Sequence, residues 1–353
     1  MGAFPDFFGN EQAAGTLAQM LQGGRIPQTI LLSGAEGIGK ATLVRRFGAA
    51  LLGGAGKIEQ DDLSLPQNVE VIEQREKWPA EKRSDDPLLF GSHPDFLTFA
   101  PDGPLQQISI QQMRLLRERA QFKPLKGARR IFLIDHLDHA NEQAANSLLK
   151  LLEEPPEHLI VFATAENLYD LLPTIRSRSI VLQMGRLSDE EMQGFALARN
   201  FPDAAARIAL SGGSPGMAAT FDLDQFRERR ALLLAAFECG CGLIPWHTWV
   251  QHSESFATRK SEKLDFYLKP AYGILEDILR VLQGRAPGTH RDILQRIEVL
   301  SRRIDYGWID KAVHSVDELV LMARRNIQKL AALDAMIINL RNHFRNDAIF
   351  ART

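Results

Sequence analysis

The segment Arg129–Ser179 reads RRIFLIDHLDHANEQAANSLLKLLEEPPEHLIVFATAENLYDLLPTIRSRS. Two short apolar runs in it, Ile131–Ile134 and Leu159–Ala163, predict buried strands, because each is too short for a helix and is followed by polar residues. The residues between them predict a helix with Asn141 as its N-cap. The prolines from Pro155 onward end this helix, because the residue before a proline is pushed out of the helical region. A strand, a helix and a strand in this order predict two parallel strands of one sheet.

Polar residues lie at the carboxyl ends of both predicted strands. Asp135 comes directly after the first strand, and Thr164 comes directly after the second. In open parallel sheets ligands bind beyond the carboxyl ends of the strands. Asp135 and Thr164 are therefore candidate ligand-binding residues of an α/β domain.

A phosphate-binding loop is predicted near the start of the chain. Residues 34–42 read GAEGIGKAT, match the pattern G-x-x-x-x-G-K, and lie between an apolar strand at Thr29–Leu32 and a helical run at Leu43–Leu52. A strand, a glycine-rich turn and a helix N-terminus direct backbone N–H groups and a partial positive charge at an anion. The glycines allow close approach of the backbone, and the lysine reaches the β and γ phosphates. The candidate nucleotide-binding residues are Gly34, Gly37, Gly39, Lys40, Thr42, Asp135 and Thr164.

At two positions on which ATP hydrolysis depends, the residues differ from those of an active ATPase site. The residue after Lys40 should ligate Mg²⁺ through a hydroxyl, and here it is Ala41. Thr42 comes one residue later, which on a helix turns its hydroxyl by about 100°. The position after Asp135, where motor ATPases keep a glutamate that activates water, is His136. We therefore expect weak, Mg²⁺-independent binding of ATP or ADP and hydrolysis that is absent or very weak.

Composition and charge are those of a globular protein with more than one domain. The chain has 353 residues, of which 45% are hydrophobic and 24% are charged, and its formal net charge is −2. This balance gives no overall basic field, so nucleic-acid contact would come from local patches. No secretion signal or membrane-spanning run is recognised, and no membrane partner is expected. Cys239 and Cys241 are one residue apart, which disfavours a mutual disulfide and favours free buried thiols in a cytoplasmic protein.

The rest of the chain changes in pattern twice. Residues 53–92 mix acidic and basic residues with few periodic apolar positions, so they predict a surface insertion or a mobile loop. From about Phe221 to Thr353 the pattern is helical, and one long helix is predicted near Val316–Phe344. Its apolar side contains Leu319, Met322, Ile327, Leu330, Leu333, Met336, Ile337 and Leu340.

Residues 145–156, ANSLLKLLEEPP, followed by LPTIRSRS at 172–179, closely resemble the bacterial DNA polymerase III clamp-loader subunits, and among these the delta-prime subunits. The resemblance covers nearly the whole chain. It implies an α/β AAA+ P-loop domain with a parallel sheet flanked by helices, a small helical lid, and an all-α C-terminal collar domain that joins subunits into a ring. The domains then span 1–184, with the insertion at 53–92, then 185–222 and 223–353.

The resemblance also implies roles for single residues. Arg178 matches the arginine of the family's Ser-Arg-Cys motif, which enters the nucleotide site of the adjacent subunit and stabilises charge on the transferring phosphoryl group. Ser179 replaces the usual cysteine, and Thr164 matches the polar sensor of the neighbouring strand. Motor subunits carry a lid arginine shortly after a Gly-Ser pair, but residues 213–217 read GSPGM. A third catalytic element is therefore absent.

Metals and partners are implied in the same way. Clamp-loader subunits commonly insert a four-cysteine zinc module after the first helix, but residues 53–92 contain no cysteine, so we expect no zinc and no other metal. The implied partners are the other clamp-loader subunits, of the gamma/tau and delta types. The sliding clamp and primed DNA are contacted as part of the complex.

Three functions remain open. The first is a delta-prime-like subunit that supports ATP-dependent loading of the sliding clamp in DNA replication, supplies Arg178 in trans and hydrolyses little or no ATP. The second is an ATP-hydrolysing motor subunit of the same family, which Ala41, His136 and the GSPGM sequence disfavour. The third is a nucleotide-binding structural protein unrelated to replication, which the match at 145–156 disfavours.

Overall fold

The computed structural model describes residues 3–257, 265–323 and 328–350, and the chain divides into two compact units. The first unit comprises the residues up to 204 together with 213–220. The second comprises 205–212 together with the residues from 221 onward. The division into three domains at 184 and 222 stays a prediction.

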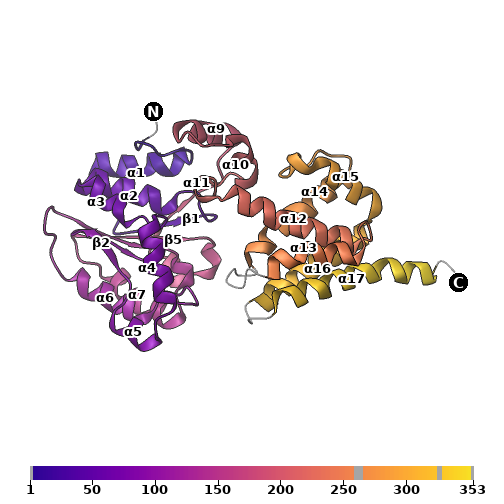
Figure 1. Cartoon of the computed structure of the whole chain (residues 1–353). Coiled ribbons are helices and arrows are strands. Elements are labelled where there is room, and N and C mark those ends of the chain that lie inside the picture. Colours follow the sequence, from indigo (N-terminus) through magenta and orange to yellow (C-terminus); the bar gives the residue numbers. More distant parts are fainter. Residues whose placement is uncertain (1–2, 258–264, 324–327, 351–353) are drawn as a thin grey trace. The chain divides into compact units, whose positions relative to one another are not determined.

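The first unit is built on a six-stranded sheet (Figure 1). Its strands are β1 Thr29–Ser33, β2 Phe90–His93, β3 Phe96–Phe99, β4 Arg130–Ile134, β5 Leu159–Ala165 and β6 Ile180–Gln183. They lie in the order β2-β3-β4-β5-β1-β6, and all neighbours are parallel except β2 and β3. The parallel pairing of β4 with β5 confirms the strand, helix and strand predicted from Arg129–Ser179.

Helices cover both faces of this sheet (Figure 1). The helical elements of the first unit are α1 Glu11–Gly23, α2 Lys40–Leu52, α3 Ala55–Ile58, η1 Glu59–Asp61, α4 Pro66–Glu76, α5 Ala80–Asp85, α6 Ile110–Ala120, η2 Leu137–His139, α7 Glu142–Glu153, η3 Leu168–Asp170, α8 Pro173–Arg176, α9 Asp189–Ala198 and α11 Pro215–Thr220. Side chains of α1 and α2 fill the core on one face, and those of α6 and α7 fill the core on the other. The expected α/β domain, with a mainly parallel sheet flanked by helices, is confirmed.

The pleat of the strands explains why the predicted runs are apolar throughout. In β1, Ile30 and Leu32 enter the core beside α2, whereas Leu31 enters the core beside α7. Successive residues of a strand point to opposite faces, so a strand covered on both faces needs an apolar residue at every position.

Capping fixes the helix that follows β4. Asn141 Oδ1 accepts a hydrogen bond from Ala144 N at 2.8 Å, which confirms the predicted N-cap. The helix α7 ends at Glu153, as expected before Pro155. The path from the end of β4 to the start of β5 is thus set by local sequence.

Residues 53–92 are largely helical, which corrects the expectation of a mobile loop. They contain α3, η1, α4 and α5, and two buried arginines anchor them. Arg45 of α2 pairs with Asp62 at 2.5 Å. Arg75 of α4 pairs with Asp102 at 2.7 Å, and these two side chains are 6% and 7% exposed. The sequence pattern missed this fold because charged pairs, rather than an apolar stripe, hold the insertion in place.

The Arg75 pair leads to a stability prediction. Arg75→Met is expected to lower the free energy of unfolding of the first unit by about 3 kcal/mol, because Asp102 is left buried without its charged partner. Chemical denaturation measures this loss, and protease cleavage within 53–92 reports local loosening. Lys77→Met is the control, because Lys77 lies in the same insertion but is exposed, so its replacement should change the stability of the first unit little. Equal losses in the two variants would mean that Arg75 does not anchor the insertion.

The described part of the second unit is built from helices, as expected. They are α10 Ala204–Ser211, α12 Leu223–Gly240, α13 Trp246–Ala257, α14 Asp265–Leu282, η4 Arg291–Ile293, α15 Leu294–Arg303, α16 Tyr306–Ala323 and α17 Lys329–Phe350. Phe237, Trp249 and Trp308 are fully buried at the centre of their core. Cys239 and Cys241 are free and buried, as predicted, and burial raises the pKa of Cys241 to about 11. Within the described ranges, no helix has the length and apolar character needed to cross a bilayer.

The prediction of one long helix near Val316–Phe344 is wrong. Two helices, α16 and α17, occupy this region, and Gln328 lies outside both. The two helices pack against each other, so their apolar residues, including Leu319 and Leu340, share one core. Ile327 lies outside the described residues. Five residues of the predicted apolar side are buried, namely Leu319, Leu333, Met336, Ile337 and Leu340, whereas Met322 is exposed and Leu330 is partly buried. Periodicity alone did not reveal the break between the helices.

Candidate functional site

The loop between β1 and α2 has the backbone shape expected of a phosphate-binding loop. Gly34, Gly37 and Gly39 have φ angles of 150°, 73° and 97°, values that favour glycine. A Cβ placed on Gly34 would lie 2.2 Å from Met184 O, and one on Gly37 would lie 2.4 Å from Ser214 Oγ. The path of this loop therefore requires glycine at these positions.

The loop ends at the N-terminus of α2. Gly39 is the N-cap of this helix, and no described side chain caps it. The N–H groups of the first turn lack intrahelical partners, and together with the helix dipole they favour an anion. The loop and helix therefore fit the phosphates of a nucleotide.

Lys40 is the first residue of α2, and its side chain is buried. Its Nζ donates hydrogen bonds to the carbonyl oxygens of Gly34 at 2.6 Å and Ala35 at 2.9 Å. Burial lowers the pKa of the Lys40 ammonium, while the negative charges of Asp135 and, more weakly, Asp138 oppose this shift. A phosphate that recruits Lys40 must replace the two carbonyl contacts, and this competition weakens binding.

Asp135 and Thr164 are brought together at the ends of β4 and β5. Thr164 Oγ1 donates a hydrogen bond to Asp135 Oδ1 at 2.5 Å and accepts one from His136 N at 2.8 Å. Both side chains are buried. The expected closeness of these strand ends is confirmed, and the role of the two residues in nucleotide binding stays a prediction.

Thr42 is placed differently from the other candidates. Its Oγ1 accepts a hydrogen bond from Arg45 Nη2 at 3.3 Å, and Arg45 in turn pairs with Asp62 of the insertion. The hydroxyl therefore lies on the side of α2 that faces the insertion. This matches the turn of about 100° per residue expected on a helix, which carries Thr42 away from the direction of a metal ligand at position 41.

The start of α11 packs against the phosphate loop. Ser214 Oγ donates a hydrogen bond to Glu36 O at 3.1 Å, and Gly216 N donates one to Gly37 O at 2.8 Å. A Cβ on Gly216 would lie 2.8 Å from Gly37 O, so a larger residue does not fit without a shift of the backbone. The segment that carries an arginine in motor subunits therefore lies too close to the loop for one at this position.

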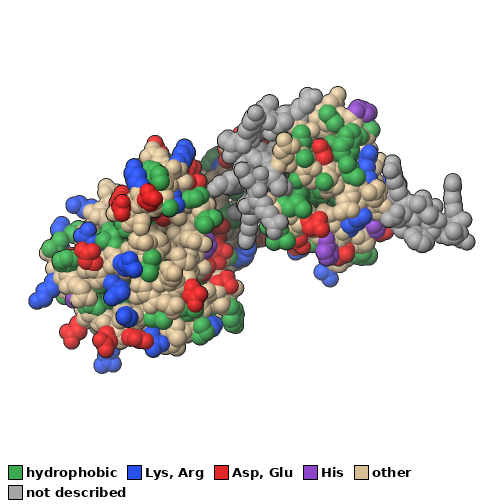
Figure 2. Space-filling model, turned by 90° about the horizontal axis from the view of Figure 1, so that it is seen from below, with side chains coloured by type: hydrophobic (Ala, Val, Ile, Leu, Met, Phe, Trp, Pro, Cys, Tyr) green, Lys and Arg blue, Asp and Glu red, His purple; other side chains and the backbone are tan. Residues whose placement is uncertain are grey.

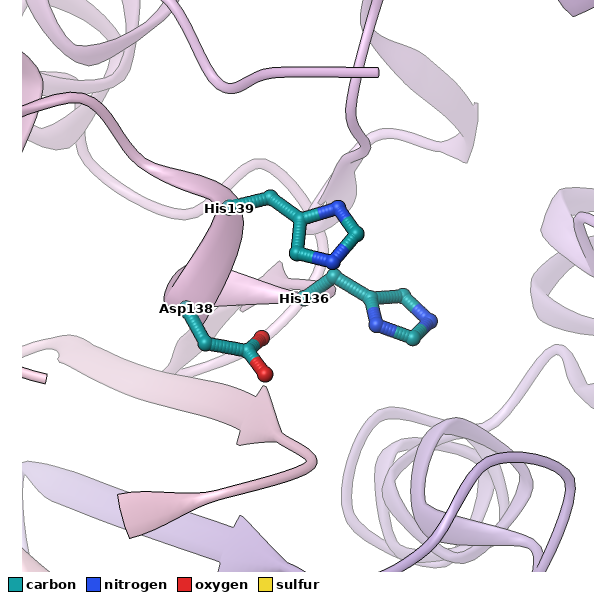
Figure 3. A group of neighbouring side chains, drawn as sticks. All are labelled: His136, Asp138 and His139. Atoms are coloured by element: carbon teal, nitrogen blue, oxygen red, sulfur yellow. The ribbon is translucent and has the colours of Figure 1, made fainter. Parts of the chain in front are cut away.

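Three residues after β4 lie together without having been predicted to do so: His136, Asp138 and His139. His136 has a left-handed backbone with a φ of 54°, and the turn η2 follows it. One potential ligand atom from each residue lies within 4.8 Å of the other two (Figure 3). The sequence signal was the spacing His-x-Asp-His, which on a regular strand or helix does not bring all three side chains to one point.

Arg178 lies in the turn between α8 and β6. Its Nη2 pairs with Glu153 Oε1 at 2.9 Å, and its Nη1 donates a hydrogen bond to Thr174 O at 3.1 Å. The Arg178 and Glu153 side chains are 36% and 50% exposed, so solvent reaches this ion pair. Ser179, which replaces the expected cysteine, donates its hydroxyl to Ile175 O at 2.8 Å.

Arg178 and the phosphate loop lie at opposite ends of the neighbouring strands β1 and β6. Ile180, the first residue of β6, pairs with Ile30 near the start of β1. A pocket of about 340 Å³ that Arg178 lines also includes Thr29, the first residue of β1. The phosphate loop leaves the other end of β1, about 13 Å away at 3.3 Å per residue. Arg178 therefore lies at the end of β1 opposite the chain's own loop.

The surface of the first unit carries both signs of charge. On the face shown in Figure 2, Lys and Arg side chains are interspersed with Asp and Glu. A protein that binds nucleic acid by itself gathers positive charge on one face or along one helix. The visible face does not have this character.

Known proteins similar to this chain are subunits of DNA polymerase III. A model of the family described as "DNA polymerase III, delta subunit" matches residues 9–188. The DNA polymerase III subunit delta′ of Pseudomonas aeruginosa is 31% identical over 213 residues, which are 57% of this chain and 57% of that protein. The DNA polymerase III subunit gamma/tau of Mycobacterium bovis is 30% identical over 188 residues, which are 50% of this chain and 28% of that protein.

The matched parts therefore span little more than half of the first relative and less than a third of the second. Among solved structures, a DNA polymerase III gamma subunit-related protein from Thermotoga maritima aligns with a TM-score of 0.45 and 17% identity. That alignment covers 92% of this chain and 98% of that chain.

Proposed function

Because the chain belongs to the DNA polymerase III delta subunit family of clamp-loader proteins, we propose that it is a delta-prime-like subunit that supports ATP-dependent loading of the sliding clamp onto primed DNA. In this role it supplies Arg178 to the nucleotide site of a neighbouring gamma/tau-type subunit and assembles with a delta-type subunit. It hydrolyses little or no ATP itself. Its contacts with the clamp and with primed DNA are made within the complex, in the cytoplasm.

The position of Arg178 carries this proposal. The side chain is partly exposed and lies at the end of β1 and β6 opposite the chain's own phosphate loop. An arginine that stabilises a transferring phosphoryl group must contact that group. Arg178 is therefore suited to a phosphate that another subunit presents, and not to one held in its own loop.

The state of the chain's own loop supports weak or absent hydrolysis. Ala41 has no hydroxyl for Mg²⁺, and Thr42 is engaged by Arg45 on another side of α2. His136 takes the place of the water-activating glutamate, and its backbone is left-handed. Each of these positions contributes separately to phosphoryl transfer, so their joint absence leaves a loop suited to binding alone.

Binding of ADP or ATP is proposed to be weak and to need little Mg²⁺. The glycine path and the uncapped N-terminus of α2 favour an anion, and neither depends on a metal. Lys40 is present but already bonded to Gly34 and Ala35, so recruiting it for a phosphate breaks two contacts.

We expect the purified chain to hydrolyse ATP no faster than buffer alone. The reason is the absence of the Mg²⁺ ligand at position 41 and of the glutamate at position 136. Phosphate release measures turnover, and calorimetric titration with ADP and ATP measures binding in Mg²⁺ and in chelator. The two titrations should give similar, weak affinities.

Lys40→Ala is the control for both measurements. It should weaken nucleotide binding, because it removes the cation of the loop, and it should leave the background phosphate signal unchanged. Turnover that Lys40→Ala abolishes would contradict the proposal. A strong dependence of affinity on Mg²⁺ would mean that Thr42 or a water supplies the metal ligand.

A motor subunit of the gamma/tau type is the second candidate. The identity to the gamma/tau protein, 30%, is almost the same as the 31% to the delta′ protein. The Asp135–Thr164 contact and Lys40 also belong to a nucleotide site of this kind. The ATPase measurement above separates the two candidates, because only a motor turns over ATP in a Lys40-dependent way.

A further inference from the structure

The residues His136, Asp138 and His139 form a compact group of metal-ligating side chains next to the end of β4. One ligand atom from each lies within 4.8 Å of the other two. Figure 3 shows the His139 ring turned toward His136, with the Asp138 carboxylate on the same side of η2. Ligand atoms around a tetrahedral ion with bonds of about 2.0–2.1 Å lie about 3.4 Å apart. His139 is exposed and His136 and Asp138 are partly exposed, so these side chains have room for small rotations toward this spacing.

Two potential ligand atoms of these side chains lack partners among the described residues. His136 Nδ1 and Asp138 Oδ1 are buried, and neither has a hydrogen-bond partner there. Buried polar atoms in folded proteins are normally paired with protein, water or an ion. Two such atoms in one small group, both able to ligate a metal, point to a common ligand.

The other polar atoms of the group hold the ligands in orientation. His139 Nδ1 lies 3.0 Å from Gln106 O, so this nitrogen carries the proton and Nε2 keeps its lone pair. Asp138 Oδ2 accepts a hydrogen bond from Glu166 N at 2.8 Å, which leaves Oδ1 available. Bonds of this kind from metal ligands to backbone groups fix the tautomer and direction of the ligands in metal sites.

We propose that His136 Nδ1, Asp138 Oδ1 and His139 Nε2 bind one divalent transition-metal ion, of which Zn²⁺ is the representative. Two imidazoles and one carboxylate suit Zn²⁺ and its neighbours, whereas Mg²⁺ and Ca²⁺ prefer oxygen ligands. Three protein ligands leave the fourth position open to water or to an anion. The sequence led to an expectation of no metal, and the proposal departs from that expectation at a group of residues outside 53–92.

The proposed metal site also interacts electrostatically with Lys40 of the phosphate loop. The negative charge of Asp138 acts on Lys40, so an ion bound to Asp138 reduces that effect. Metal binding nevertheless does not depend on nucleotide, because all three ligands come from one short segment after β4. The proposal is therefore tested on the chain alone, and its failure would leave the proposed clamp-loader function untouched.

The experiment titrates the full-length chain, without nucleotide, with Zn²⁺ in competition with a chromophoric chelator near neutral pH. We expect one equivalent to bind, and an excess of Mg²⁺ not to displace it. His139→Ala and Asp138→Asn should each weaken binding by about tenfold or more, since each removes one of three ligands. Both residues lie partly or fully at the surface, so circular dichroism should show unchanged folding.

His247→Ala is the matched control, because His247 is an exposed histidine on α13 in the other unit. It should leave the Zn²⁺ affinity unchanged. Co²⁺ bound to the native chain should give the visible absorption of a low-coordinate nitrogen and oxygen site, and His139→Ala should remove it. Absence of a stoichiometric site, or equal affinity in the native chain, His139→Ala and Asp138→Asn, would overturn the proposal.

Discussion

Arg178→Ala is expected to lower the DNA- and clamp-stimulated ATPase of the reconstituted clamp loader while leaving its assembly intact. In the proposed role, the variant removes a charge that stabilises the transition state in a neighbouring subunit. Arginine fingers contribute about 10³–10⁵-fold to phosphoryl transfer. Only one of several nucleotide sites is affected, so the loss for the whole complex should be partial. Steady-state phosphate release from complexes at equal assembly measures it.

Two substitutions in the same chain make this result specific. Arg176→Ala removes a neighbouring arginine that stacks over Tyr169, with 5.5 Å between its guanidinium carbon and the ring centroid, and it should change turnover little. Lys40→Ala removes the cation of the chain's own loop, and it should also change turnover little. If Lys40→Ala is damaging and Arg178→Ala is silent, the chain is a motor and its proposed role is wrong.

A chain ending at Asp222 is expected to remain folded in its first unit and to lose co-purification with the other clamp-loader subunits. This truncation removes the helices from α12 to α17, whose core contains Phe237, Trp249 and Trp308. The sheet and its two helical layers form a separate core, which the truncation leaves complete. Residues 205–212 belong to the removed unit, so α10 should lose its order.

Affinity purification of a tagged partner subunit, followed by quantification of each subunit, measures this loss. Circular dichroism and thermal unfolding of the truncated chain provide the control, because an unfolded first unit would also fail to bind. Co-purification of the folded, truncated chain at the native ratio would show that assembly does not depend on the C-terminal helices.

The sheet and the phosphate loop were predictable because their signals are local. Apolar runs such as Ile131–Ile134 are buried on both faces, and Asn141 caps its helix by a contact three residues away. The phosphate loop could be recognised from its glycines, because few other residues adopt the positive φ angles that its backbone has. The same local reasoning placed Asp135 beside Thr164, since parallel strands end at one edge.

The other features could not be predicted, because they depend on contacts between residues that the sequence pattern does not show. The insertion folds around Arg45 and Arg75, whose acidic partners lie up to 27 residues away in sequence. The left-handed backbone at His136 turns two later side chains back toward it, and no residue type in that segment requires this conformation. The lid segment could be seen to lack an arginine, but only the approach of Gly216 to Gly37 gives the steric reason.

In the proposed role of Arg178, its contact with Glu153 sets how readily this arginine is released to a partner. An ion pair open to solvent contributes about 0.2–1 kcal/mol, and salt screens it further, with a Debye length of about 8 Å at physiological ionic strength. A finger that contributes 10³–10⁵-fold in rate corresponds to about 4–7 kcal/mol in the transition state. In this proposed role, exchange of the Glu153 carboxylate for the transferring phosphoryl group is therefore favourable in the transition state. Until a neighbour docks, the carboxylate keeps the long side chain near one rotamer, which reduces the conformational entropy lost when the subunits meet.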